Sequence, residues 1–170
     1  MLFSLATPES SILQTKATKI RVHLKSGIAE IFADHQDLMG TIENNMVEFE
    51  TNFDNKVETR KYLVEDGIFV VSTKNKISAN FPNPDIETAV YAYGKRIIEI
   101  NSQTKLLLDQ ISKEYEQKSN LLLKEEQTIK EEQNIKKSVS YELLKTTSFL
   151  LLKQEVEFLK KVILTIKELK

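Results

Sequence analysis

The stretch KIRVHL at residues 19–24 decides how the first half of the chain is interpreted. It alternates apolar and polar side chains, so an extended strand would present one apolar and one polar face. MVEFET at residues 46–51 repeats this alternation, and GIFVVS at residues 67–72 is more continuously apolar, as in a strand through the middle of a core. Turn-forming residues separate these runs. The pattern predicts an antiparallel β-sandwich over residues 1–82.

The second half of the chain lacks the residues that interrupt helices. All prolines and glycines fall within residues 1–94, so residues 95–170 contain neither. The boundary is expected in FPNPDIE at residues 81–87, where Asn83 can cap a helix and Pro84 suits its first turn. We therefore expect helical structure from this point to the end of the chain.

The helical region, residues 83–170, is predicted to be a long hairpin with its turn within residues 124–138. The first arm has an apolar stripe at helical spacing, formed by Ile86, Val90, Tyr93, Ile97, Ile100, Leu107, Ile111 and Tyr115. KEEQTIKEEQNIKK at residues 124–137 is polar, and a second stripe follows, including Leu143, Thr147, Leu150, Gln154, Phe158 and Ile166. Because this polar segment also consists of good helix formers, a single continuous rod is the alternative.

Composition excludes several classes of partner. The chain has 170 residues, with 24 Lys and Arg against 25 Asp and Glu, so its net charge of −1 gives no attraction to nucleic acid or an acidic membrane. It has no cysteine, which excludes disulfides and thiolate metal sites and fits the cytoplasm. The longest aliphatic or aromatic run is FLLL at residues 149–152, far below the roughly 20 apolar residues of a membrane helix. We expect no direct membrane insertion.

Motifs that carry chemistry are missing from the sequence. His23 and His35 are the only histidines and do not have the spacing of a metal site. There is no GxxxxGK[ST] phosphate loop, no GxGxxG fingerprint and no GxSxG nucleophile elbow. We expect no catalytic residue, cofactor or metal ion, and a small hydrolase lacks both a nucleophile and a base.

Four segments, in order, resemble one family. They are LATPESSIL at residues 5–13, GIAEIFADHQDLM at 27–39, DGIFVVSTKNKIS at 66–78, and PDIE at 84–87. The second occupies the place of a GEFGVLPGHAPLL-like loop and keeps Gly27, His35 and Leu38. The chain thus resembles the epsilon subunit of F-type ATP synthases, which is called delta in mitochondria.

The resemblance implies a non-catalytic subunit of the central stalk. Its sandwich would bind the gamma subunit, and its hairpin would reach the catalytic alpha/beta hexamer and regulate ATP hydrolysis. Glu30, Ala33 and Asp34 replace the family's second glycine and its proline, and Ile28 replaces an acidic residue, which weighs against docking to a membrane ring. The family's ATP-sensing motif is not visible. The expected location is the cytoplasm, peripheral to the membrane through the complex.

The residues expected at partner interfaces form two groups. Those in the loop are Gly27, Glu30, Asp34, His35 and Leu38, and those in the helices are Leu107, Ile111, Leu150 and Phe158. The alternative function is an adaptor or prefoldin-like chaperone built from strands and a coiled coil. Such a protein would co-purify with varied clients or as a homo-oligomer, whereas a stalk subunit would co-purify with gamma-like and hexamer-like proteins.

Overall fold

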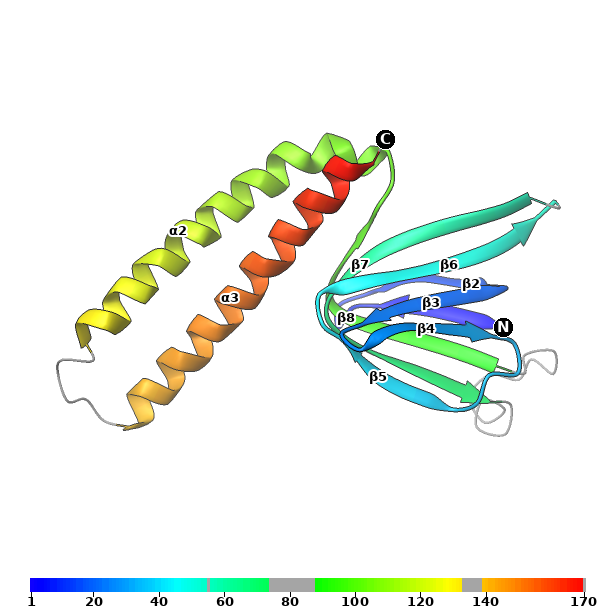
Figure 1. Ribbon diagram of the computed structural model, residues 1–170, viewed down its shortest axis with the longest axis horizontal. Helices are drawn as coiled ribbons and strands as arrows, with labels where there is room; N and C mark the ends of the chain where they lie inside the picture. Colours follow the sequence, from blue (N-terminus) through cyan, green and yellow to red (C-terminus); the bar gives the residue numbers. More distant parts are fainter. Residues whose placement is uncertain (55, 74–87, 133–138, 170) are drawn as a thin grey trace. The chain divides into compact units, whose positions relative to one another are not determined.

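The computed structural model describes residues 1–54, 56–73, 88–132 and 139–169. The chain divides into two compact units, Met1–Asn101 and Ser102–Lys170. The first unit is a β-sandwich and the second contains two long helices (Figure 1). The predicted fold class, a sandwich followed by a helical hairpin, is confirmed.

The sandwich is built from strands that follow the predicted runs. KIRVHL is strand β3, MVEFET lies within β6, and GIFVVS lies within β7. The strands are β1 Leu2–Ala6, β2 Ser11–Lys16, β3 Lys19–Leu24, β4 Gly27–Phe32, β5 Leu38–Ile42, β6 Asn45–Phe53, β7 Lys56–Thr73 and β8 Thr88–Glu99.

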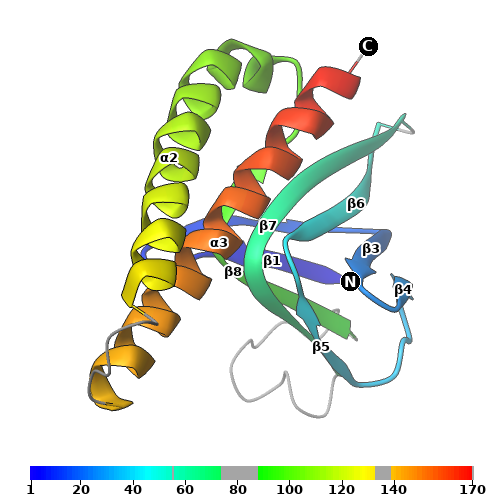
Figure 2. The same ribbon diagram turned by 60° about the vertical axis from the view of Figure 1, so that its left-hand side comes forward.

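Strand β7 joins the two layers of the sandwich. The strand order is β2-β1-β8-β7-β6-β3-β4, and β5 also pairs with β7. β7 pairs with β6 as far as Val64 and with β5 from Gly67 onward, so it passes from one layer to the other between these residues. Figure 2 shows the pronounced curve of β7 that results. The sheet is not closed into a barrel.

The core between the layers is aromatic and aliphatic. Phe3, Phe49 and Phe69 are buried, and the rings of Phe3 and Phe49 lie 5.0 Å apart. Phe49 stacks on Tyr62 with ring centroids 6.0 Å apart, and the Arg60 guanidinium lies 5.7 Å from the Tyr62 ring. The remaining members of this cluster include Leu5, Ile20, Val22, Ile31, Ile42, Val47, Val64, Val71 and Val90. The alternating apolar positions of the strands thus supply the core.

The predicted start of the helical region at residue 83 is wrong. Residues 83–87 lie outside the described part of the chain, and Thr88–Glu99 is strand β8. Its first half pairs in parallel with β1, from Leu2 opposite Ala89 to Ala6 opposite Tyr93, while β7 pairs antiparallel on its other side. Val90 and Ala92 are buried in the core, as period-two alternation requires. The helical stripe through Val90, Tyr93 and Ile97 therefore does not exist.

The helical unit begins with the 3-10 helix η1, Gln103–Leu107, followed by α2, Leu108–Glu132, and α3, Val139–Glu168. The Lys118 ammonium donates to the Glu155 carboxylate over 2.8 Å, which links α2 to α3 and excludes a single rod. The part of the predicted turn region up to Glu132 is helical, and residues 133–138 lie outside the described chain. Neither helix, within the described residues, has an apolar stretch sufficient to cross a membrane.

Candidate interaction surfaces

The segment expected as one long loop, residues 27–39, is mostly strand. Gly27–Phe32 forms β4, and Leu38 begins β5, so only residues 33–37 connect the two. Gly27 stands at the start of β4, with a φ of 138°, and Asp34 lies beyond its end. These two expected interface residues are therefore separated by a whole strand and do not converge on one site.

Glu30, expected at a partner interface, is engaged within the sandwich. Its Oε1 accepts from Arg21 Nε at 2.6 Å and lies 2.9 Å from Lys19 Nζ. Hydrogen bonds from Lys19 and then Arg21 hold the pKa of this carboxyl below its ordinary value. Glu48 is also engaged within the sandwich. Its Oε1 lies 3.0 Å from His23 Nε2, and its Oε2 lies 4.0 Å from Lys61 Nζ.

The connection between β4 and β5 is held by local hydrogen bonds. Asp34 has a positive φ of 66°, and the His35 N–H donates to the Phe32 carbonyl at 3.3 Å. His35 Nδ1 lies 2.8 Å from the Gln36 carbonyl oxygen. Asp37 Oδ1 accepts from the Thr73 N–H at 3.0 Å, which ties the connection to the end of β7. Asp34 is exposed and His35 is half-buried, so this is an ordered surface turn.

The helical candidates divide by burial. Ile111 and Phe158 are buried, whereas Leu107 and Leu150 are about half exposed. Gln154 of the predicted second stripe is exposed as well. The stripe is thus not a single buried seam. Exposed leucines remain in η1, at Leu106 and Leu107, and along α2 and α3, at Leu121, Leu123, Leu150, Leu151 and Leu164.

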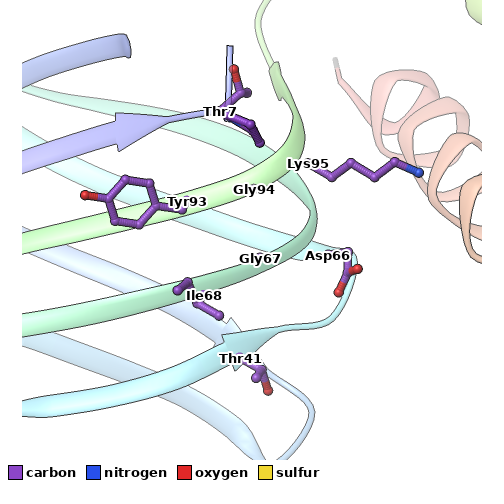
Figure 3. A pocket seen from close by; sticks show the side chains of 9 residues that line it. Thr7, Thr41, Asp66, Gly67, Ile68, Tyr93, Gly94 and Lys95 are labelled. Atoms are coloured by element: carbon purple, nitrogen blue, oxygen red, sulfur yellow. The ribbon is translucent and has the colours of Figure 1, made fainter. Parts of the chain in front are cut away.

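An open pocket of about 600 Å³ lies where β7 bends. Gly67 and Gly94 face each other across β7 and β8 and line it. Figure 3 shows the side chains of Ile68 and Tyr93 on the neighbouring strands that border it. The other lining residues are Thr7, Pro8, Thr41, Asp66 and Lys95. Sequence reasoning missed this pocket because it depended on pairing β8 with β7.

These surfaces combine apolar and charged side chains. Among the described residues, no group of three or more His, Cys, Asp or Glu side chains could hold a metal ion. The pocket combines a lysine and an aspartate with a tyrosine and aliphatic groups, and its lining has no histidine. The arrangement can bind another molecule by shape and apolar contact.

Comparison with known proteins finds one family that the sandwich resembles. Residues 1–79 match the family described as ATP synthase, Delta/Epsilon chain, beta-sandwich domain. The match covers β1 to β7 and stops short of β8.

A particular solved structure is also similar. It is a chain in the structure of the mitochondrial ATP synthase of Euglena gracilis, described as OSCP/F1/c-ring in rotational state 1. The two chains are 14% identical with a TM-score of 0.44, and the similarity covers 66% of this chain and 64% of the other. The chain therefore spans less than two thirds of that relative. No match was found among curated protein sequences.

Proposed function

We propose that the chain is a non-catalytic rotor subunit in the central stalk of an F-type or F-type-like rotary ATPase. The observation that supports this most directly is the match of residues 1–79 to the delta/epsilon sandwich family. In this proposal the sandwich attaches to a gamma subunit, and the complex keeps the chain peripheral to the membrane on the cytoplasmic side.

The helical hairpin has the regulatory role in this proposal. Its exposed leucines, such as Leu121 and Leu150, give it apolar surface to offer a partner. A hairpin without a catalytic group changes the rate of an enzyme only by binding one of its states more tightly than another. The partner proposed for the hairpin is the alpha/beta hexamer, and the candidate residues are Leu107 and Leu150.

Docking to a membrane ring is not part of the proposal. The residues that replace the family's glycine and proline belong to a regular strand and a short turn, and Glu30 is paired with Lys19 and Arg21. Gly27, Asp34, His35 and Leu38 remain candidates for contacts with another rotor protein at this edge of the sandwich.

The test is purification of the native complex through an affinity tag on the full chain, with its subunits identified by mass spectrometry. A stalk subunit is expected to bring a gamma-like protein and both hexamer proteins in fixed stoichiometry. A variable set of clients, or a homo-oligomer alone, would instead identify an adaptor and refute the proposal. An untagged strain processed in parallel controls for proteins that bind the matrix.

A further inference from the structure

The two helices of the hairpin pack along a seam that has the spacing of a coiled coil (Figure 1). Its positions advance by alternating steps of four and three residues, and none of them is exposed. On α2 they are Ile111, Tyr115, Lys118, Leu122, Glu125 and Ile129. On α3 they are Ile166, Val162, Leu159, Glu155 and Leu152. This seam differs from the predicted stripe, and charged residues occupy some of its positions.

The seam is apolar and buried only at the base of the hairpin, where α2 begins and α3 ends. The seam residues there are at most 5% exposed, and they are Ile111, Leu159, Val162 and Ile166. Beyond them, residues 112–129 of α2 and 147–155 of α3 include no buried side chain. Because helices in proteins are stabilised mainly by packing of an apolar face, the base is held more firmly than the rest of the hairpin.

A charged layer interrupts the seam where the buried base ends. The Lys118 ammonium donates to Glu155 Oε2 over 2.8 Å and lies 3.5 Å from Glu114 Oε1. Burial lowers the pKa of Lys118, but the hydrogen bond to Glu155 and the charges of both carboxylates raise it by more, so the lysine stays charged. The Lys118 and Glu155 side chains are only 28% and 24% exposed. A charged pair in this setting fixes the register of two helices but contributes less stability than an apolar layer.

Glu125 places a second carboxylate in the seam, one heptad beyond Lys118. Its Oε2 is buried and has no hydrogen-bond partner within the described part of the chain. The corresponding step on α3, seven residues before Glu155, reaches Ser148, which is exposed. A carboxylate oxygen withdrawn from water without a partner costs free energy. Packing of the two arms is therefore less favourable here than at the base.

We propose that the hairpin works in two parts: the base stays closed, and a distal part, residues 119–129 of α2 and 147–154 of α3, opens reversibly as far as the Lys118 and Glu155 pair. In the open form Glu125 regains its contact with water, while Leu122 and Leu152 lose their seam contacts. That loss is small, because neither leucine is fully buried. The inference goes beyond the proposed function, since it concerns the chain alone and holds for any partner of the hairpin.

Hydrogen exchange of the full chain, followed by mass spectrometry of its peptides, tests the opening. Separated arms of this length are marginal helices in water, so their amides should exchange while those of the base stay protected. We expect exchange in the distal part to be at least about tenfold faster than in residues 108–117 and 156–166. Equal rates in the two parts would overturn the inference.

A pair of matched double variants tests the role of the charged layer. Lys118→Leu combined with Glu155→Leu makes the layer apolar, and Lys113→Leu combined with Glu157→Leu makes the same changes at exposed positions of the same helices. We expect the first to slow exchange in the distal part at least about tenfold, and the second to leave it within about twofold of the wild type. Circular dichroism melts and light scattering check that each variant is folded and does not associate.

Glu125→Leu is an independent check at the second polar position of the seam. It removes the carboxylate that the closed form leaves without a partner, so it should also slow exchange in the distal part, whereas Glu116→Leu at an exposed position should not. If neither the charged-layer variant nor Glu125→Leu slows exchange, or if the exposed controls slow it equally, the inference is wrong. The proposed function would still stand, because its own test is the composition of the native complex.

Discussion

At the scale of single residues, two places in the sandwich stand out by their packing. One is the pair Gly67 and Gly94, where β7 turns from one layer to the other. A Cβ atom at Gly67 would contact the Tyr93 carbonyl oxygen, and one at Gly94 would contact the Val64 side chain. The other is Arg60, whose guanidinium covers the stacked rings of Phe49 and Tyr62. The glycine pair leaves little space for a side chain, whereas the Arg60 side chain stays partly exposed.

Gly67→Ala is expected to destabilise the protein by about 1 to 3 kcal/mol, because the new methyl group meets backbone that cannot move without breaking the β7 to β8 pairing. Chemical denaturation monitored by circular dichroism measures the change. Thr41→Ala, at an exposed position on β5, is the control and should cost less than about 1 kcal/mol. Equal losses in both variants would show that the bend tolerates a side chain.

Tyr62 should make stability depend on alkaline pH. Burial raises its pKa to about 12, more than the nearby Arg60 guanidinium lowers it. Since the ordinary tyrosine pKa is about 10, the unfolded chain loses this proton first, and the contribution of Tyr62 is complete below pH 10 and lost as the pH approaches 12. The stability advantage of the wild type over Tyr62→Phe should therefore be smaller at pH 11 than at pH 9.

The comparison of the two proteins removes the effect of the remaining tyrosines, which both contain. Denaturation curves at pH 9, 10 and 11 give the difference in unfolding free energy at each pH. A difference that stays constant or grows with pH would mean that Tyr62 ionises at least as easily in the folded chain as in the unfolded one.

At the scale of elements, β8 is the strand on which the sandwich depends. It lies between β1 and β7, pairing with the first in parallel and with the second antiparallel. Its far end is fastened by Glu99, which accepts hydrogen bonds from Arg60 Nε at 2.9 Å and Nη2 at 2.6 Å. The Ile100 N–H also donates to the Lys61 carbonyl at 2.8 Å. The sandwich is thus complete only at Asn101, where the first compact unit ends.

Residues 1–101 are therefore expected to fold alone, whereas residues 1–82, the domain predicted from sequence, are not. The shorter fragment lacks β8 and leaves unpaired edges on both β1 and β7. Cooperative thermal melting and a monomeric elution volume are the measurements for both fragments. A soluble, cooperatively melting 1–82 fragment would show that β8 is dispensable for the fold.

At the scale of the whole molecule, the chain joins a β-sandwich to a helical hairpin. The sandwich has an outer face of paired charges, while the hairpin exposes leucines on both helices. In the proposed function these parts divide the work, because attachment to the rotor needs a permanent interface and regulation needs a reversible one.

Truncation after Asn101 tests this division. The truncated chain should still assemble with the gamma-like subunit, and the ATPase rate of the complex should rise if the hairpin restrains hydrolysis. A tenfold change corresponds to about 1.4 kcal/mol of differential binding, a small demand on several exposed leucines. Steady-state ATPase assays of complexes with the full and truncated chains measure it. Identical rates at all nucleotide concentrations would refute the regulatory role.

The sequence by itself determined that a β-sandwich is followed along the chain by a helical hairpin. Alternation in KIRVHL and MVEFET is a local signal, because the burial of every second residue is a property of the strand itself. The long stretch without glycine or proline likewise predicted α2 and α3. The cap expected at Asn83 and Pro84 was a weaker signal, and together with the apolar stripe it led to the wrong assignment of β8.

Only the tertiary structure decided where the sandwich ends and which surfaces it offers. TAVYAYGKRIIE at Thr88–Glu99 fits a helical stripe as well as a strand, and its pairing with β1, over eighty residues away, selects the strand. The pocket is lined by residues of β5, β7 and β8 together with Thr7 and Pro8, so no local stretch contains it. Pairing between strands far apart in the sequence determines where the sandwich ends and which surfaces it offers. A period of two says which residues of a strand share a face, but it does not say which strands lie beside one another.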